Sequence, residues 1–209
     1  YYRRMVSSGP CISLSNHIKI NVLPGVNGNQ IGNSQTVCIG QSAAPLNGVQ
    51  LLSGGDNVYQ YQWQTSTDSL TWTNIFGATN ANYAPGVLNG TIHYFRRIVT
   101  SGPCNTLQAS TSNAISIRVL PLIANNTITS SQTICNAQQP ATINGSLPIG
   151  GDNTYTYIWQ SSTDSLTWNN IVGQTSQNLQ PVALLQTTWY KRIVNSNACS
   201  NVSIPVKIT

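Results

Sequence analysis

Apolar and polar residues alternate along several short segments of this chain, and the pattern predicts β-strands throughout. The clearest case places Tyr59, Tyr61 and Trp63 at every second position, and residues 115–119 alternate in the same way. A period of two is typical of a strand with one buried face, and no segment shows the period of about 3.6 that marks an amphipathic helix. We therefore expect an all-β fold.

The aromatic segment occurs twice. Gly54–Trp72 reads GGDNVYQYQWQTSTDSLTW and Gly150–Trp168 reads GGDNTYTYIWQSSTDSLTW, with 15 of 19 positions identical. Three of the four differences fall at the alternate positions 58, 60 and 62, which predicts that the Tyr-x-Tyr-x-Trp face is buried and the other face meets solvent or a neighbouring strand. The predicted core residues are Tyr61, Trp63, Trp72, Tyr157, Trp159 and Trp168.

Other segments repeat as well, and they predict the domain organisation. Residues 1–11 match residues 94–104, and residues 15–24 match residues 112–121. Self-similarity at a fixed spacing indicates a tandem repeat protein. We expect the C-terminal strands of a truncated repeat at 1–23, complete repeats at 24–121 and 122–209, and a longer parent chain of which this is a window.

Within one repeat, short strands are separated by turn residues. The expected strands besides the aromatic one lie at 34–40, 79–85, 87–89, 92–99 and 113–120, and the Asn47-Gly48 pair suits a tight turn. About seven short strands with a central Trp fit an immunoglobulin-like β-sandwich. Because the joints at Pro24 and Pro121 are short and contain proline, we expect tandem sandwiches that form an elongated, stiff rod.

The five cysteines occupy matched positions in the repeats. Cys38 and Cys104 form one matched pair and Cys135 and Cys199 the other, while Cys11 corresponds to Cys104. The simplest interpretation is one disulfide within each repeat, Cys38–Cys104 and Cys135–Cys199, with the partner of Cys11 outside the chain. Disulfides indicate an oxidising compartment.

Charge and composition exclude several classes of function. Charged residues make up 6% of the chain, and each complete repeat carries three basic and two acidic residues. The paired arginines at 96–97 lie within a strand and point to opposite faces, so they form no phosphate-binding stripe. We expect no nucleic-acid partner, no membrane-embedded segment, no metal and no cofactor.

Candidate catalytic groups are equally scarce, and we expect no enzyme. His93 of one repeat is replaced by Thr188 in the other, which removes any shared Ser-His-Asp arrangement. Asp56 and Asp152, in the Gly-Gly-Asp-Asn segments, are interpreted as turn formers that bond their own backbone, with a weak ion site as the alternative.

The repeat motif resembles a known family. The run GGDNxYxYxWQxSTDSLTWxNI, followed by (Y/W)(Y/F)(R/K)R(I/M)V and a cysteine, is similar to the tandem immunoglobulin-like or PKD-like repeats of giant surface proteins of Bacteroidota. Such repeats resemble those of adhesins exported by type IX secretion, including gliding adhesins, and the resemblance covers essentially the whole chain. It implies an extracellular protein attached at the outer membrane, in which the repeats have a spacer or adhesive role.

The resemblance also gives meaning to Ser69 and Ser165. Both lie in Asp-Ser-Leu triplets, which match the Asp-(Ser/Thr)-aliphatic pattern on which Bacteroidota attach O-glycans to exported proteins. The resemblance therefore implies O-glycosylation at both serines. The alternative is a serine that only completes a turn.

Two hypotheses for function follow. The first is a structural or adhesive segment, a stalk or filament, of a large secreted cell-surface adhesin used in surface attachment or gliding. The alternative is an accessory carbohydrate-binding array of a secreted polysaccharide-degrading enzyme. The expected partners are neighbouring repeats of the same chain, together with surface polysaccharide or other cell-surface proteins.

Overall fold

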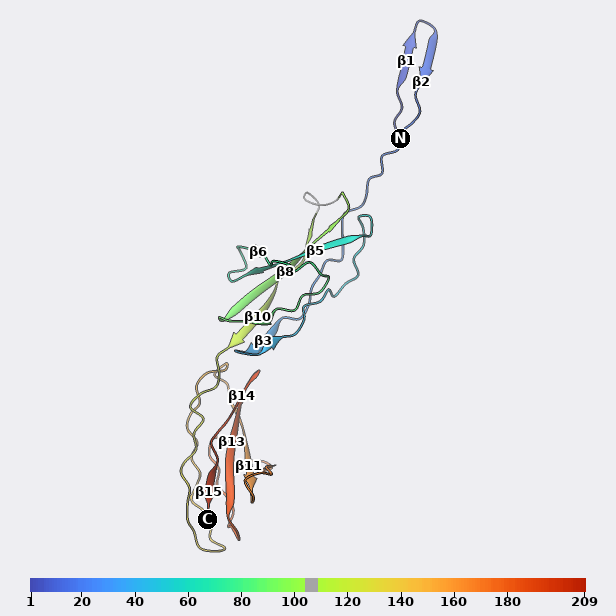
Figure 1. Cartoon of the computed structure of the whole chain (residues 1–209). Coiled ribbons are helices and arrows are strands. Elements are labelled where there is room, and N and C mark those ends of the chain that lie inside the picture. The colour runs from blue at the N-terminus through green and yellow to red at the C-terminus, as the bar shows by residue number, and fades with distance from the viewer. Residues whose placement is uncertain (104–108) are drawn as a thin grey trace.

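The computed structural model describes residues 1–103 and 109–209, and within these ranges it contains strands and no helix (Figure 1). The all-β fold class is therefore confirmed. The strands are β1 (Met5–Ser8), β2 (Cys11–Leu14), β3 (Gln35–Cys38), β4 (Ser42–Ala43), β5 (Tyr59–Ser66), β6 (Thr73–Asn74), β7 (Gly86–Val87), β8 (Ile92–Ser101), β9 (Ser110–Thr111), β10 (Ile115–Leu120), β11 (Thr156–Ser162), β12 (Asn169–Asn170), β13 (Thr188–Ser196), β14 (Cys199–Val202) and β15 (Val206–Ile208).

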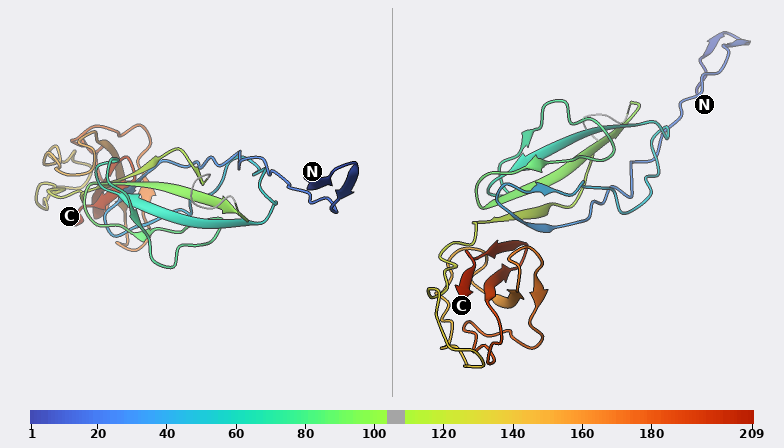
Figure 2. Two further views of the ribbon diagram at one scale, coloured as in Figure 1. Left: turned by 90° about the horizontal axis from the view of Figure 1, so that it is seen from above. Right: turned by 60° about the horizontal axis from the view of Figure 1, so that its bottom comes forward.

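The chain is elongated. An exposed N-terminal hairpin, β1–β2, is followed by a first domain that contains β3 to β10 and a second that contains β11 to β15, and the three parts follow one another along one direction (Figures 1 and 2). The tandem immunoglobulin-like arrangement predicted from the repeats is thus the architecture of the molecule.

In the first domain, one sheet has the order β3-β10-β8-β5-β6, and β9 pairs with β8. β3 runs parallel to β10, and the other neighbours are antiparallel. The opposite layer is built from the β4–β7 pair and from isolated bridges such as Leu46–Tyr83. Two facing layers with this order form an immunoglobulin-like sandwich.

The second domain repeats this plan. Its main sheet has the order β12-β11-β13-β14, with β15 also paired to β13. The facing layer is held by isolated bridges, among them Ile128–Gly145 and Ile143–Leu179. In both domains the register sets a tryptophan opposite an arginine, because Trp63 pairs with Arg97 and Trp159 with Arg192.

Trp63 and Trp159 are the centres of their domains. Both side chains are 0% exposed, and the indole Nε1 groups donate hydrogen bonds of 3.0 Å to backbone carbonyls, that of Trp63 to Asn80 and that of Trp159 to Ser176. A buried indole with its N–H satisfied can pack without a desolvation penalty. The prediction that these two tryptophans belong to the core is confirmed.

The other predicted core aromatics lie farther out. Tyr61 and Tyr157 are half-buried, as are Trp72 and Trp168. Placing Trp72 and Trp168 in the core was wrong: each lies on the outer surface of its sheet, where a cation covers the ring, at 4.3 Å for the Arg96 guanidinium over Trp72 and at 4.1 Å for the Lys191 ammonium over Trp168. Each of these tryptophans directly precedes the short return strand of its hairpin, β6 or β12, and so lies outside the regular part of the sheet.

A buried arginine lies beside each core tryptophan. Arg192 is 0% exposed, and its guanidinium donates to four neutral oxygens: Oδ1 of Asn126 at 2.9 Å and the carbonyls of Gln177, Ser146 and Thr127 at 2.8, 2.9 and 3.5 Å. These acceptors come from the layer facing β13 and from the loop after β12. The guanidinium therefore ties the two layers together.

The first domain uses the same device. Arg97 is 2% exposed and donates from Nε to Oδ1 of Asn29 at 3.0 Å and from Nη1 to the carbonyl of Ala81 at 2.6 Å. Its Cζ atom lies 5.3 Å from the ring centre of Tyr61 and 5.7 Å from that of Trp63. Arg96 faces outward as noted above, so the prediction that the paired arginines point to opposite faces is confirmed.

The Asn47-Gly48 pair does not form the tight turn that we predicted. Gly48 bridges Ile31 within the thin layer, and its counterpart Gly145 bridges Ile128. Neither glycine has a positive φ. The absence of a side chain serves the buried arginine instead, because a Cβ atom on Gly145 would lie 1.8 Å from Nη1 of Arg192.

We therefore predict that Gly145→Ala destabilises the second domain by about 2–4 kcal/mol, since the new methyl group can be accommodated only by breaking the guanidinium hydrogen bonds. Gly48→Ala is expected to cost the first domain less, because the nearest atom to its Cβ, Nη2 of Arg97, lies at 3.0 Å. Urea denaturation followed by tryptophan fluorescence measures both changes.

Gly25→Ala is the matched control. A Cβ atom there meets no atom within 4 Å and the φ is ordinary, so its midpoint should match that of the unsubstituted chain. Equal midpoints for Gly145→Ala and Gly25→Ala would show that the arginine does not need the space.

Candidate functional site at the interdomain junction

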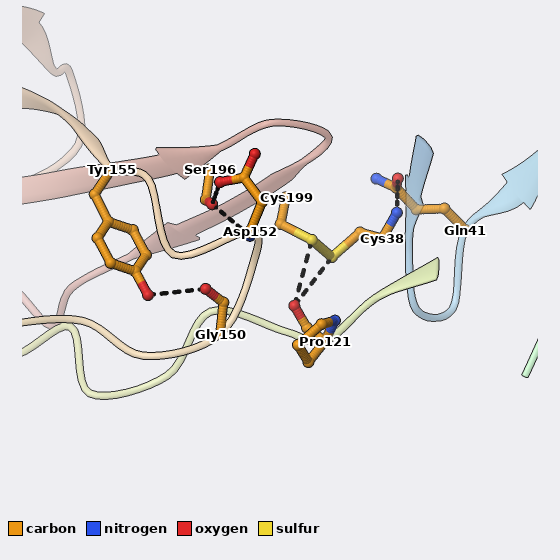
Figure 3. Close-up of a disulfide and its surroundings, with 8 residues drawn as sticks. All are labelled: Cys38, Gln41, Pro121, Gly150, Asp152, Tyr155, Ser196 and Cys199. Carbon is orange, nitrogen blue, oxygen red and sulfur yellow. Dashed lines mark hydrogen bonds between the residues drawn. A yellow bond between two sulfur atoms is a disulfide. The ribbon is translucent and has the colours of Figure 1, made fainter. Parts of the chain in front are cut away.

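A disulfide joins the two domains. Cys38, at the end of β3, is bonded to Cys199, at the start of β14, with a Cα–Cα distance of 5.1 Å and a sequence separation of 161 (Figure 3). Both cysteines are buried, at 4% and 2% exposed. In the chain-entropy model, closing a loop of this length destabilises the unfolded chain by about 5 kcal/mol.

This bond overturns the predicted pairings. Cys38–Cys104 and Cys135–Cys199 are both wrong, because Cys38 is bonded to Cys199. Cys104 itself lies outside the described residues. Cys11 and Cys135 are exposed and carry no disulfide, as the prediction had it for Cys11.

The strand directions explain why a bond within one domain is excluded. Cys38 pairs with Leu120 of β10, and β10 reaches Leu120 only after it has passed Ile92, the first residue of β8. Cys38 therefore lies near the start of β8, and Ser101 ends this ten-residue strand on the opposite side of the domain. Ten residues of strand span about 30 Å. The second domain, where both cysteines are described, shows the result: Cys135 follows Ile134, whose N–H donates to the carbonyl of Thr209 near the start of β13, whereas Cys199 pairs with Ser196 at the far end of that strand. Cys135 and Cys199 therefore lie at opposite ends of the domain.

The Gly-Gly-Asp-Asn turn binds the joint between the domains. The N–H of Gly151 donates to the carbonyl of Pro121 at 3.0 Å, and the N–H of Gly55 donates to that of Pro24 at 2.8 Å. Gly150 has φ 89°, and a Cβ atom on it would lie 2.1 Å from the carbonyl oxygen of Leu122. Only glycine permits both this conformation and this close contact.

The aspartate of the turn fixes it to the end of the long strand. The N–H of Asp152 donates to Oγ of Ser196 at 2.9 Å, and that hydroxyl donates back to the Asp152 carboxylate at 2.7 Å. The carboxylate also accepts from the N–H of Thr154, and these hydrogen bonds, chiefly that from Ser196, lower the pKa of Asp152. Asp56 and Ser101 repeat the arrangement, so the turn-forming role predicted for the aspartates is confirmed.

Apolar side chains fill the junction around the disulfide. Leu120 and Ile123, on either side of Pro121, pack with Val194 and the two cysteines. Tyr155 and Tyr157 of the aromatic strand pack against this cluster, and the Tyr155 hydroxyl donates to the carbonyl of Gly150 at 2.8 Å (Figure 3). The tyrosines of the repeated aromatic strand thus serve the junction, while the tryptophan serves the core.

The candidate glycosylation sites lie at the tips of the aromatic hairpins. Ser69 and Ser165 are exposed and have φ angles of 60° and 61°. Asp68 accepts a hydrogen bond from the Thr71 hydroxyl, and its Oδ1 accepts from the N–H groups of Thr71 and Leu70, both at 2.8 Å. These bonds, chiefly that from the Thr71 hydroxyl, hold the pKa of Asp68 well below its usual range. The aspartate shapes the tip and leaves the serine side chain facing solvent.

Among the described residues, no group of three or more His, Cys, Asp or Glu side chains could hold a metal ion. Within those same residues, no helix is long and apolar enough to cross a membrane. The junction is a mechanical connection of covalent, hydrogen-bonded and apolar contacts.

We predict that Cys199→Ser loosens the junction without unfolding either domain. The far-ultraviolet circular dichroism spectrum should stay unchanged, because both cores are independent of the bond. Small-angle X-ray scattering should show a broader distribution of interdomain distances, since only the Pro121 clamp and the apolar cluster remain. Cys135→Ser is the control and should leave the scattering curve unchanged; a curve for Cys199→Ser that matches it would mean that the disulfide does not restrict the joint.

One comparison with known proteins, that with family models, agrees with the repeat structure. No curated protein matches this sequence. The solved structure titled "Tandem Ig repeats of Dlar" matches with 11% identity and a TM-score of 0.34, over 86% of this chain and 95% of that one. A family model described as "Domain of unknown function (DUF8696)" matches twice, at residues 27–121 and 124–209. The chain therefore belongs to this domain family and carries two successive copies of its domain.

Proposed function

We propose that this chain is a structural and adhesive rod segment of a large secreted bacterial cell-surface protein, and that it has no catalytic role. The observation that carries the proposal is the disulfide between Cys38 and Cys199, which fixes one domain to the next. A covalent bond across the joint limits how far one domain can move relative to the other. This restriction suits a spacer that must hold its length and direction.

The other contacts of the junction support the same role. The clamp on Pro121 and the apolar cluster restrict the joint independently of the disulfide. Disulfides persist in oxidising surroundings, which supports an extracellular or cell-surface location. Because Arg97 and Arg192 are buried, neither is available to contact the phosphates of a nucleic acid.

The finer proposal follows from the resemblance to adhesin repeats of Bacteroidota. In it, the rod separates a terminal binding region from the outer membrane and takes part in surface attachment or gliding, with surface polysaccharide or other cell-surface proteins as partners. Exposed hairpin tips at Ser69 and Ser165 are accessible to a glycosyltransferase. O-glycans there would keep weakly charged rods apart sterically.

A second candidate function, carbohydrate binding, is favoured by one groove on the first domain. It has a volume of about 350 Å³, and its lining includes Tyr59, Tyr61, Gln50, Asn82 and Arg97. Aromatic rings with amide groups beside them offer the stacking surface and the hydrogen bonds that a sugar needs. This groove would serve the alternative of an accessory array in a polysaccharide-degrading enzyme.

A glycan array probed with the full chain separates the two functions. The rod proposal predicts no sugar-dependent binding by the unsubstituted chain. Asn82→Ala removes a side-chain amide from the groove, and Gln60→Ala is the control because Gln60 is exposed and outside the groove lining. Binding that Asn82→Ala abolishes and Gln60→Ala preserves would contradict the rod proposal and establish carbohydrate recognition.

A further inference from the structure

Cys135 is the second-domain counterpart of Cys38, and the two differ in one respect: Cys38 is bonded to the next domain, whereas Cys135 is exposed. We propose that Cys135 is a covalent docking site for another repeat of this family. The bond would form with the hairpin cysteine of that repeat, the one that matches Cys199. The inference goes beyond the proposed function, because it concerns how repeats are joined and holds whatever the rod attaches to.

The loop around Cys135 already has the conformation of the bonded loop. The N–H of Cys135 donates to Oε1 of Gln138 at 3.0 Å, as the N–H of Cys38 donates to Oε1 of Gln41 at 3.1 Å. Two residues after each cysteine the backbone is left-handed, with φ 84° at Gly40 and 64° at Ala137. An alanine held in this conformation shows that the loop shape is kept even without glycine.

A groove with both apolar and polar lining residues lies beside Cys135. Its volume is about 180 Å³, and it is lined by residues that include Ile134, Leu184, Leu185 and Thr209. Leu185 is 79% exposed. A groove of this kind next to a thiol is suited to a hairpin that brings apolar side chains together with a cysteine.

The same end of the first domain shows what covers such a surface. There, Leu120, Ile123 and Val194 pack around the disulfide, and two of these side chains come from beyond Pro121. The occupant in the first domain is thus the hairpin end of an adjoining repeat. We assign the same kind of occupant to the groove at Cys135.

The hairpin half of the contact also recurs. Cys11 pairs with Ser8 across the β1–β2 hairpin, as Cys199 pairs with Ser196 across β13–β14. The hairpin cysteine is therefore presented at the same register in both described copies. Both halves of the junction are repeated features of this sequence.

The register of the last strand gives the place where an adjoining repeat would join. Ile208 pairs in parallel with Gln132, as Ile117 pairs with Gln35, so Thr209 corresponds to Arg118. A repeat that begins with the counterpart of Val119 would continue this strand in register. The linker between the two repeats would then lie next to Cys135, as Pro121 lies next to Cys38.

The bond requires an oxidant, and a disulfide such as oxidised glutathione is sufficient. The Cys135 thiolate attacks that disulfide, forms a mixed disulfide and releases one reduced glutathione. The hairpin thiolate then attacks the Cys135 sulfur and releases the second. Two thiols lose two protons and two electrons, and one oxidised glutathione becomes two reduced molecules.

The test extends the full chain after Thr209 with a second copy of residues 119–209. Cys11, Cys104 and the copy of Cys135 are replaced by serine, which leaves Cys38, Cys199, Cys135 and the copy of Cys199. Four cysteines allow three pairings. The extended chain is oxidised in glutathione buffer, and its disulfides are identified by non-reducing peptide mapping.

The expected result is Cys38–Cys199 together with Cys135 bonded to the copy of Cys199. Gly150→Ala in the copy should lower the fraction of the second bond, because it removes the clamp on the joint, and should leave Cys38–Cys199 intact. The proposal is overturned if Cys135 stays open to alkylation while Cys38–Cys199 has formed, or if Cys135 pairs elsewhere. If the second disulfide forms and the glycan array also shows sugar-dependent binding, the rod function is rejected and the docking role of Cys135 stands.

Discussion

Both domains are built around a buried arginine whose hydrogen-bond acceptors, among the described residues, are all neutral. Burying a guanidinium group is costly unless its N–H groups are satisfied. Arg192 meets that condition with neutral oxygens, one from an asparagine side chain and the others from the backbone of the facing layer and of the loop after β12. The facing layer has few regular strands, and the arginine supplies much of what holds it against the main sheet.

Other repeated features follow from this constraint. Asn126 must present its Oδ1 atom and Gly145 must lack a side chain, or the guanidinium loses acceptors or space. The same strand, β13, carries Arg192 in the core and Ser196 at the junction. The strand that anchors the two layers of a domain therefore also anchors the turn that binds the preceding joint.

The fold could be predicted from alternation and self-similarity, because Trp63 and Trp159 mark the buried face of a strand unambiguously. The disulfide could not. In a uniform repeat, the same set of cysteine positions is compatible with a bond within a domain and with a bond between domains, and the strand directions decide between them. Arg97 left a signal that we did not use: it falls at the inward position between Phe95 and Val99, where an apolar residue would be usual.

The disulfide also determines how the molecule responds to tension. When it is pulled between Pro24 and Thr209, force passes from Cys38 directly to Cys199 and bypasses the residues between them. At about 3.5 Å per extended residue, roughly 560 Å of chain is removed from the load-bearing path. Unfolding of either core then adds almost nothing to the end-to-end distance. The segment therefore keeps nearly the same length under tension, whether its cores are folded or unfolded.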